Sequence, residues 1–425
     1  MTECFHVYRF FAARAIWVVS LLVLWAGNAQ AQITFGADLG AMIGHARNQH
    51  PEVVAASLET EALAARATGS DSLPDPMFQV EFKDLTRGRG IAPNDAGNRT
   101  YMVAQQFPLG GKRDLRRAIA NSDTAEADAR RRTMAEDLVM RVKSVHAQRF
   151  ATTAGIRLLQ EQRVLLNRVV EATDRAYEQG RLGQDAPLMA RLSLSRQDVE
   201  IERLEGDRRR YDARLTALLG LDDGVQLAAP RSFAPIPPMD GVDAGSLLVL
   251  ARERSPELLQ QDTRINRGEQ QIRLADAEWV PDITLGAGVM EESLGVRGYE
   301  ALVSVNIPLR WGLRDAKRGE AVAEASAARA KRQAVELDLA GRLREGLAML
   351  AAQKRVEVLL TRQTLPQAQA TMEAALRAVE QGSAPVSEVL LAQNRLLEVE
   401  LERLNIQAEQ RMTLAEIERA VGGEL

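Results

Sequence analysis

The chain has 425 residues, and its 54 Lys and Arg against 58 Asp and Glu give a formal net charge of −4. This balance argues against the broad basic surface that nucleic-acid binding needs, so we expect no nucleic-acid partner. Aromatic residues make up only 4% of the chain. Ala, Leu, Arg, Glu and Gln dominate the central stretches instead, a composition typical of long helices rather than compact cores.

The segment 1–31 has the pattern of a secretory signal peptide. An apolar run over 16–26 follows basic residues, and Ala29-Gln30-Ala31 fits a small-x-small cleavage site. The run is too short to cross a bilayer as a helix, which needs about 20 residues. Cys4 is the single cysteine, so we expect a mature chain without a disulfide or a thiol for lipid attachment. Export then leads to the periplasm, the medium or an outer-membrane β-barrel.

The two halves of the chain repeat each other. Matches recur in one order and at nearly one offset: His50-Pro51-Glu52 with Ser255-Pro256-Glu257, Phe107-Pro108-Leu109 with Ile307-Pro308-Leu309, and Glu178-Gln179-Gly180 with Glu380-Gln381-Gly382. This indicates a duplicated unit. We divide the mature chain into a first repeat, 32–220, a proline-rich equatorial linker, 221–242, and a second repeat, 243–425.

Each repeat reads helix, strand, loop, strand, long helix, tight turn and helix. The expected helices cover 38–70, 113–179, 187–219, 244–278, 314–381 and 386–421. Pro366 lacks a backbone donor and should interrupt the last long helix. Apolar residues recur at spacings of three and four, as in a coiled-coil seam. The seam of the first long helix is Leu138, Val142, Val145, Ile156, Leu159, Leu166, Val170 and Tyr177.

Four alternating segments are expected as strands: 77–84, 99–108, 283–291 and 300–308. Each has an apolar and a polar face, with Gln105 as an exception, and roughly the 9–11 residues that cross a bilayer as a tilted strand. Aromatic residues flank the strands as two membrane girdles would. Phe107, Trp279 and Trp311 stand at the helix-side ends, and Tyr101 and Tyr299 at the loop-side ends. Alternation alone leaves a soluble two-hairpin domain as the other interpretation.

Four strands cannot close a barrel, because the smallest known barrels have about eight. Open sheet edges are not tolerated in lipid. Transmembrane strands would therefore require an oligomer, with eight strands in a dimer or twelve in a trimer.

The stretch after each second strand is expected to join barrel and helix. Proline ends the strand ladder and glycine lets the chain bend. The junction residues are Pro108, Gly110 and Gly111 in the first repeat and Pro308 and Gly312 in the second. We interpret Lys112 and Arg113 as a charged collar at the membrane face.

These features resemble the TolC-type outer membrane efflux proteins over nearly the whole mature chain. The duplicated frame carries the resemblance, together with Gln106-Phe107-Pro108-Leu109 before Gly111-Lys112-Arg113, and with the turns ending at Gly180 and Gly382, each followed eight residues later by a leucine, Leu188 or Leu390. The resemblance implies a mainly α fold with a small β part. In it, a homotrimer with four strands per protomer forms a transmembrane β-barrel in the outer membrane, joined to a long α-helical barrel in the periplasm.

The resemblance also implies a function. The chain would be the passive, non-enzymatic exit duct of a tripartite efflux pump, in contact with a periplasmic adaptor, an inner-membrane pump and outer-membrane lipid. The Phe-Pro-Leu-x-Gly-Lys-Arg segment resembles the heavy-metal cation branch of cobalt-zinc-cadmium type. A duct for drugs or for a type I secreted polypeptide is an alternative. A periplasmic coiled-coil adaptor or structural protein, which belongs to a different functional class, is a further alternative.

No site chemistry stands out in the residues themselves. The sequence has no nucleophile elbow, phosphate loop or zinc motif, so we expect no enzyme and no cofactor. The mature chain offers His45, His50 and His146, without cysteine or a run of methionines. We therefore expect no tight metal site.

The family's periplasmic entrance is narrowed by carboxylates just past the turns. Glu388, six residues after Gly382, is the implied gate candidate, while Asp185, five after Gly180, departs from the pattern. A solvated first-turn carboxylate favoured by the helix dipole is the alternative for Glu388. The turns are the implied adaptor contacts: Gly180, Arg181, Leu182, Gly183, Gly382, Ser383 and Ala384.

Overall fold

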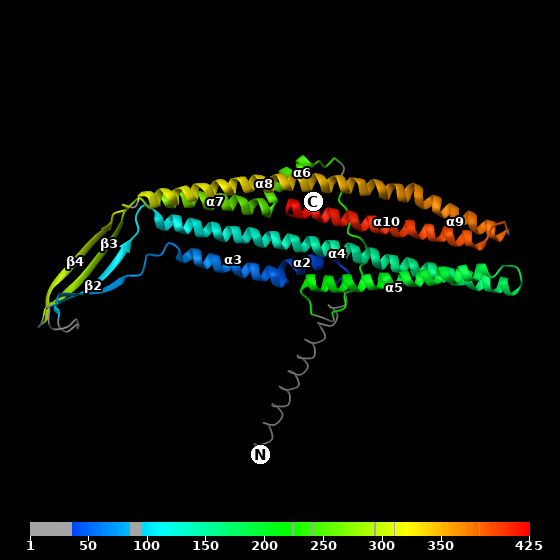
Figure 1. Cartoon of the computed structure of the whole chain (residues 1–425), viewed down its shortest axis with the longest axis horizontal. Helices are drawn as coiled ribbons and strands as arrows, with labels where there is room; N and C mark the ends of the chain where they lie inside the picture. Colours follow the sequence, from blue (N-terminus) through cyan, green and yellow to red (C-terminus); the bar gives the residue numbers. More distant parts are fainter. Residues whose placement is uncertain are drawn as a thin grey trace, which may run out of the picture. The chain divides into compact units, whose positions relative to one another are not determined.

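A computed structural model describes residues 36–85, 96–222, 225–239, 241–292, 295–309, 311–381 and 383–425 (Figure 1). The expected signal peptide, 1–31, and Gly382 lie outside these residues. The elements are α2 (Leu39–Gln49), α3 (Pro51–Gly69), β1 (Met77–Leu85), β2 (Ala96–Phe107), α4 (Lys112–Glu178), α5 (Asp185–Leu219), α6 (Ala244–Arg254), α7 (Pro256–Ala277), β3 (Asp282–Glu292), β4 (Gly295–Asn306), α8 (Trp311–Leu359), η2 (Leu360–Thr364), α9 (Leu365–Glu380) and α10 (Val386–Val421). Among the helices so described, none combines the length and apolarity needed to cross a membrane.

Two helices predicted as continuous are each broken before a proline. The segment 38–70 forms α2 and α3, and 244–278 forms α6 and α7. His50 and Ser255 adopt extended ψ values of 131° and 118°, because a following proline disfavours the helical conformation. The proline then starts the next helix, where the missing donor costs nothing.

The predicted interruption near Pro366 is confirmed. Helix α8 ends at Leu359, a π-helical turn covers Leu360–Thr364, and α9 begins at Leu365. Pro366 has no N–H to donate to the preceding turn, and the wider π turn absorbs this missing hydrogen bond.

The four strands form one antiparallel sheet in the order β1-β2-β3-β4. Its central ladder joins the two sequence repeats, because β2 pairs with β3 from Asn98↔Glu292 to Phe107↔Ile283. Strands β2 and β4 begin earlier than predicted, at Ala96 and Gly295. Within the sheet described, β1 and β4 each pair on one side only.

The sheet belongs to a compact unit made of Ala55–Thr133 and Pro256–Asp338. In this unit α7 packs beside α4 and α8, and a Cβ built on Gly268 of α7 would lie 3.0 Å from the Ala325 Cβ of α8. Ion pairs join α7 to both neighbours: Arg264–Glu126 at 2.8 Å, Arg329–Glu269 at 2.9 Å and Arg332–Asp262 at 2.7 Å.

A second compact unit comprises the described parts of Met1–Val54, Met134–Ser255 and Leu339–Leu425. One of its cores lies where α2, α4 and α5 pack together, and it includes Met42, Val142 and Leu215, all 0% exposed. The predicted seam is confirmed at the positions that are at most 5% exposed: Leu138, Val142, Val145, Ile156, Leu159 and Leu166. The seam prediction is wrong at Tyr177, because this side chain is 45% exposed.

Candidate functional site

The β-sheet carries an apolar face with large exposed side chains. We call this the apolar face, defined by Phe78, Phe82, Val103, Leu285, Tyr299, Val303 and Val305. Tyr299 is 89% exposed and Val303 70%, while Thr100 and Ala104 on the opposite, polar face are 1% and 2% exposed. An aligned set of exposed apolar side chains on one face is typical of a strand surface that contacts lipid.

Gln105, the exception to the predicted alternation, lies on the apolar face. Its side-chain amide donates to the backbone oxygen of Pro74 at 2.6 Å and of Gln106 at 3.1 Å. These bonds satisfy the amide locally, which removes most of the cost of a polar group in apolar surroundings.

Tyr101 and Tyr299 occupy one row of the sheet, because both pair with Val289. They lie within their strands rather than at the loop-side ends, since both strands start earlier than predicted. The next row outward is charged: the Arg99–Glu291 distance is 4.0 Å, and the Tyr101 hydroxyl donates to the Glu291 carboxylate at 3.3 Å. A loop-side girdle at the tyrosine row stays a prediction, because Phe82 pairs with Arg99 and continues the apolar face beyond this row.

Phe107, Trp279 and Trp311 are the residues predicted for the helix-side girdle. Phe107 ends β2, and Trp311 is the first residue of α8 and is 63% exposed. The Arg314 guanidinium lies 5.7 Å from the centre of the Trp279 ring. An aromatic ring paired with a cation suits a membrane–water interface. The arrangement of two aromatic girdles around the strands stays a prediction.

The junction after β2 is built around a buried ion pair. The Lys112 side chain is 6% exposed and its Nζ lies 2.6 Å from Asp282 Oδ1 and 2.7 Å from the Val280 oxygen. Asp282 also accepts the Leu109 N–H at 3.2 Å. The interpretation of Lys112 as part of an exposed collar is therefore wrong: its charge is used inside the protein to tie the start of α4 to the start of β3.

The predicted junction residues use their backbones differently in the two repeats. Pro108 and Pro308 each follow the last residues of a strand. Gly110 and Gly111 have φ values of 73° and 72°, in the left-handed region. Gly312 instead lies in the first turn of α8, so the second junction bends without a left-handed glycine there.

We expect Gly110→Ala to destabilise the junction more than Gly111→Ala. Both positions have a left-handed φ, which costs a non-glycine residue about 1–2 kcal/mol. At Gly110 a Cβ would also lie 2.9 Å from Val280 Cγ2, whereas at Gly111 nothing lies within 4 Å. Thermal unfolding of the two variants in detergent measures the difference, and equal losses would contradict the steric argument.

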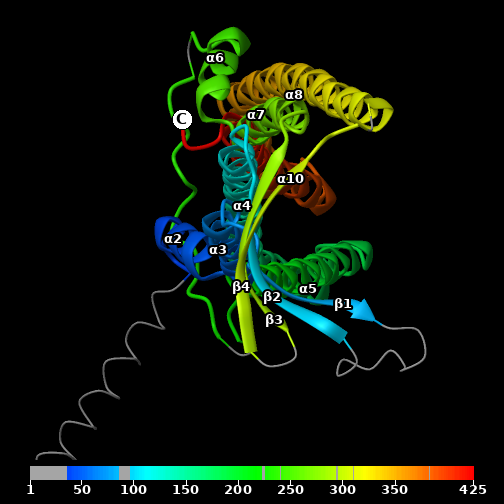
Figure 2. The same cartoon turned by 90° about the vertical axis from the view of Figure 1, so that its left-hand side faces the viewer.

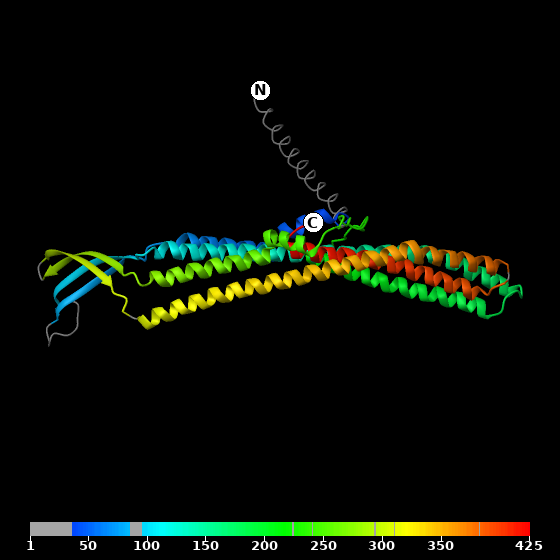
Figure 3. The same ribbon diagram turned by 90° about the horizontal axis from the view of Figure 1, so that it is seen from above.

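The tips of the α4–α5 and α9–α10 hairpins lie side by side (Figures 1 and 3). A buried cluster of Leu166, Ala190, Val386 and Leu390 packs them together, with Leu182 and Val379 at its margin. Gly180 has φ 66°, and the N–H groups of Ser383 and Ala384 both donate to the Ala378 oxygen. Arg181 and Gly183 are exposed at the first turn.

The two leucines that follow the turns differ in role. Leu390 is 4% exposed, in the cluster between the hairpins, whereas Leu188 is 56% exposed. Equivalent sequence positions in the two repeats therefore face different surroundings.

The two gate candidates lie in the first turns of the helices after the tips. Asp185 is the first residue of α5 and Glu388 the third of α10, and both are exposed. The Glu388 N–H donates to the Pro385 oxygen at 3.1 Å. Their role at an entrance stays a prediction. In the part of the chain that the structure describes, no group of three His, Cys, Asp or Glu could hold a metal ion.

Two arginines, one buried and one partly buried, hold the proline-rich linker, and no pattern in the sequence predicts this role. Arg149 is 3% exposed and donates to the oxygens of Leu227 and Ala228 at 3.0 and 2.8 Å. Arg411 donates to the Ala234 oxygen at 3.0 Å, with its guanidinium 4.3 Å from the centre of the Phe233 ring. The linker is anchored through its carbonyl groups, which proline retains when it loses the N–H.

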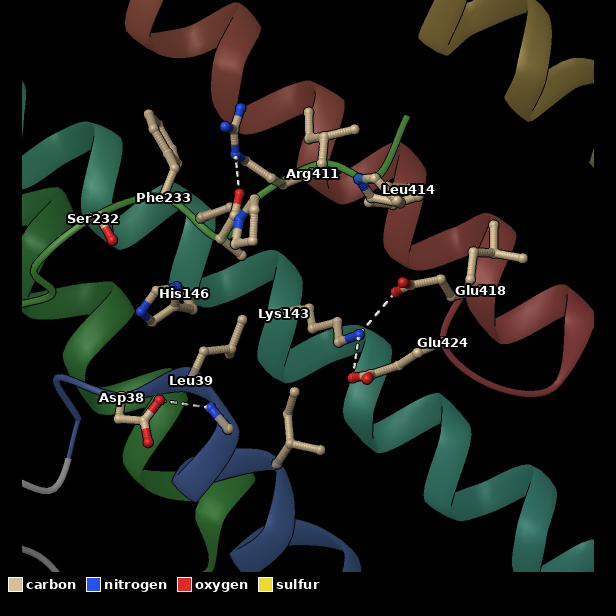
Figure 4. Close-up of a pocket in the computed structure, with 18 of the residues that line it drawn as sticks. Asp38, Leu39, Lys143, His146, Ser232, Phe233, Arg411, Leu414, Glu418 and Glu424 are labelled. Atoms are coloured by element: carbon tan, nitrogen blue, oxygen red, sulfur yellow. Dashed lines mark hydrogen bonds and ion pairs between the residues drawn. The ribbon is translucent and has the colours of Figure 1, made fainter. Parts of the chain in front are cut away.

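A cavity of about 670 Å³ lies beneath this linker (Figure 4). Lys143 bridges Glu418 and Glu424 at 2.8 and 3.0 Å on one side of it. His146, 3% exposed, also lines it, and its Nε2 has no hydrogen-bond partner. Burial, and then the nearby Arg149 charge, lower the pKa of His146 to about 4, so the imidazole is neutral at neutral pH.

Protein stability should therefore fall in acid through His146. Its pKa is about 4 in the folded chain against 6.5 ordinarily, so the unfolded chain binds the proton more readily in this window. The resulting loss is about 2–3 kcal/mol between pH 6.5 and 4. Urea unfolding of His146→Gln at several pH values should show a shallower pH dependence than the unsubstituted protein; identical slopes would exclude His146 as the cause.

Known proteins resemble this chain in both sequence and fold. The family model described as "Outer membrane efflux protein" matches residues 247–423. The chain is 24% identical over 314 residues to the nickel-cobalt-cadmium resistance protein NccC of Alcaligenes xylosoxydans xylosoxydans, covering 72% of this chain and 69% of NccC. It is 22% identical over 298 residues to the nickel and cobalt resistance protein CnrC of Cupriavidus metallidurans, covering 68% and 67%.

The fold has a solved counterpart along nearly the whole chain. The structure of the outer-membrane channel OprN matches with a TM-score of 0.77, at 17% identity, over 91% of this chain and 90% of that chain. The family match lies in the second repeat, and the fold match extends to the first. The matched second repeat identifies the chain as a relative of the outer membrane efflux proteins, a family of channels rather than of enzymes, and the solved structure shows that its fold is that of such a channel over both repeats.

Proposed function

We propose that three copies of this chain form the exit duct of a tripartite efflux pump, with twelve strands closing a barrel in the outer membrane. The single observation that carries this is the four-stranded sheet whose edge strands β1 and β4 each pair on one side only. Three such sheets joined edge to edge remove every edge, which a lipid environment requires. The apolar face then meets lipid and the polar face lines the lumen.

The tips of the two hairpins are the proposed contact with a periplasmic adaptor, which links the duct to an inner-membrane pump. They are joined by their own apolar cluster, so they form one rigid surface rather than two loose loops. Glu388 is the proposed entrance carboxylate. Glu388→Gln should lower the cation-to-anion permeability ratio of the reconstituted channel, because rings of carboxylates select cations; an unchanged ratio would remove it from this role.

The proposed cargo is a heavy-metal cation. Both curated relatives are named for resistance to nickel and cobalt, and one also for cadmium. A duct for such ions needs weak, exchangeable contacts, since a tight site would trap the cation.

Growth of a strain that lacks the gene tests the cargo. We expect reduced tolerance to nickel, cobalt or cadmium, restored by the full-length gene on a plasmid. A panel of drugs serves as the comparison. Unchanged metal tolerance with increased drug sensitivity would replace the metal proposal with a drug duct. Recovery of the protein only from the soluble periplasmic fraction would contradict the outer-membrane duct itself.

A further inference from the structure

On the polar face of the sheet, one lysine side chain contacts two glutamate carboxylates. Lys83 of β1 lies 3.3 Å from the Glu81 carboxylate on its own strand and 3.7 Å from the Glu300 carboxylate on β4. The three side chains are 28–48% exposed. We call Glu81, Lys83 and Glu300 the charged cluster.

The contact between Lys83 and Glu300 reveals the curvature of the sheet. Strands β1 and β4 are separated by β2 and β3, so their backbones would be about 14 Å apart across a flat sheet. Side chains from both edges meet most easily when the face that carries them is concave. The strands of this sheet curve and twist, as Figure 2 shows.

Each glutamate of the cluster pairs with a small residue on the neighbouring strand. Thr100 pairs with Glu81, and Gly288 pairs with Glu300. Thr100 is 1% exposed, and a Cβ built on Gly288 would lie 2.5 Å from the Tyr101 oxygen. Only glycine fits at 288, where the Met102 backbone and side chain of the neighbouring strand approach closely.

We propose that the charged cluster is an ion-selective ring on the lumen wall of the β-barrel, separate from the carboxylates at the periplasmic entrance. The inference rests on the proposed trimer, in which the concave polar face encloses the pore. The cluster carries one net negative charge per copy, so three copies favour cations over anions in the outer part of the duct. Lys83 moderates this field, because it offsets one of the two carboxylates in each copy.

Conductance of the purified full-length channel in planar bilayers tests the ring. Under a potassium chloride gradient near 0.1 M, we expect Lys83→Gln to raise the cation-to-anion permeability ratio about twofold and Glu300→Gln to lower it by a similar factor. Both changes should vanish at 1 M salt, because the Debye length falls from about 10 Å to about 3 Å.

Arg99→Gln is the matched control. Arg99 and Lys83 lie at neighbouring rows, since Lys83 pairs with Asn98, but Arg99 is on the opposite face, where its distance from Glu291 is 4.0 Å. The Arg99→Gln variant removes one positive charge, as Lys83→Gln does, but from the outer face of the proposed barrel. Its permeability ratio should equal that of the unsubstituted channel, and a shift as large as that of Lys83→Gln would overturn the assignment of faces.

A second experiment avoids any effect of substitution on folding. The chain's single cysteine, Cys4, lies in the expected signal peptide. Lys83→Cys therefore introduces a single thiol into the mature chain, and this thiol can be modified after the channel has begun to conduct. A positively charged methanethiosulfonate should restore the original permeability ratio, and a negatively charged one should raise it further. The unsubstituted channel receives the same reagents.

The outcomes separate the two proposals. If the channel conducts but Lys83→Gln leaves its selectivity unchanged and neither reagent alters Lys83→Cys, the ring is refuted while the duct stands. If the unsubstituted protein forms no channel, the proposed function fails and the ring fails with it.

Discussion

Lys112→Met is expected to lower the thermal unfolding temperature of the protein in detergent by on the order of 5–10 °C. Lys112 and Asp282 are both largely buried, with side chains 6% and 15% exposed. Removing one partner of such a pair leaves a buried charge without compensation, which costs about 3–5 kcal/mol. The loss falls on the connection between β2, β3 and the first turn of α4, so the sheet should lose order first.

Two variants show whether the cost comes from the stranded carboxylate. Lys112→Met combined with Asp282→Asn should recover more than half of the loss, because the amide oxygen still accepts the Leu109 N–H without carrying a charge. Lys317→Met is the exposed comparison, since its pair with Glu278 at 3.1 Å is 48% and 35% exposed. That change should cost about 0–1 kcal/mol. A Lys112→Met loss no larger than this would contradict the buried-pair argument.

Arg149→Met is expected to release the linker between the repeats. Besides its two linker carbonyls, Arg149 lies 2.5 Å from the Asp212 carboxylate of α5 and 3.4 Å from the Gly36 oxygen. One guanidinium therefore ties three segments to α4, and its planar donors suit that number of acceptors. Its loss should cost about 3 kcal/mol.

Limited proteolysis within 225–239, together with urea unfolding, measures the effect. Arg149→Met should be cut faster in the linker while the helical hairpins stay resistant. Arg163→Met is the control on the same helix, because the Arg163–Asp198 pair is 50% and 42% exposed and should contribute about 0–1 kcal/mol. Equal cleavage rates in the two variants would show that the linker is held by other contacts.

Local patterns predicted most of the fold. The four strands follow from their two-residue alternation, and the buried seam of α4 follows from its helical spacing. The interruption at Pro366 follows from a missing donor. Each of these features depends on residues close together in the chain, where the periodicity of the backbone alone decides which side chains share a face.

The parts that sequence patterns missed depend on distant partners. Lys112 reads as an exposed cation because its neighbours are glycine and arginine, while Asp282, which buries it, lies in the other repeat. Arg149 is a charged residue within the apolar seam of α4, and the linker carbonyls that accept its hydrogen bonds lie far from it along the chain. The starts of β2 and β4 were placed too late because residues of low strand propensity there are held by cross-strand pairing.

The same reasoning changes what the Phe-Pro-Leu-x-Gly-Lys-Arg segment means. Its glycines provide the left-handed turn, its lysine makes the buried pair, and the Arg113 Nε donates to the Asp71 oxygen at 2.5 Å. These roles are structural and carry no preference for a cargo. The proposed metal specificity therefore rests on the named relatives and on the growth experiment.

The central β2–β3 ladder also has a consequence for how the chain is made. Residues 98–107 pair with residues 283–292, so the sheet cannot be completed until both repeats have left the ribosome and crossed the inner membrane. The two hairpins form from local contacts, but their docking is a late, non-local step of the slow kind. Until then, β2 and β3 each present an open edge, and the first repeat depends on protection against aggregation while it waits for the second.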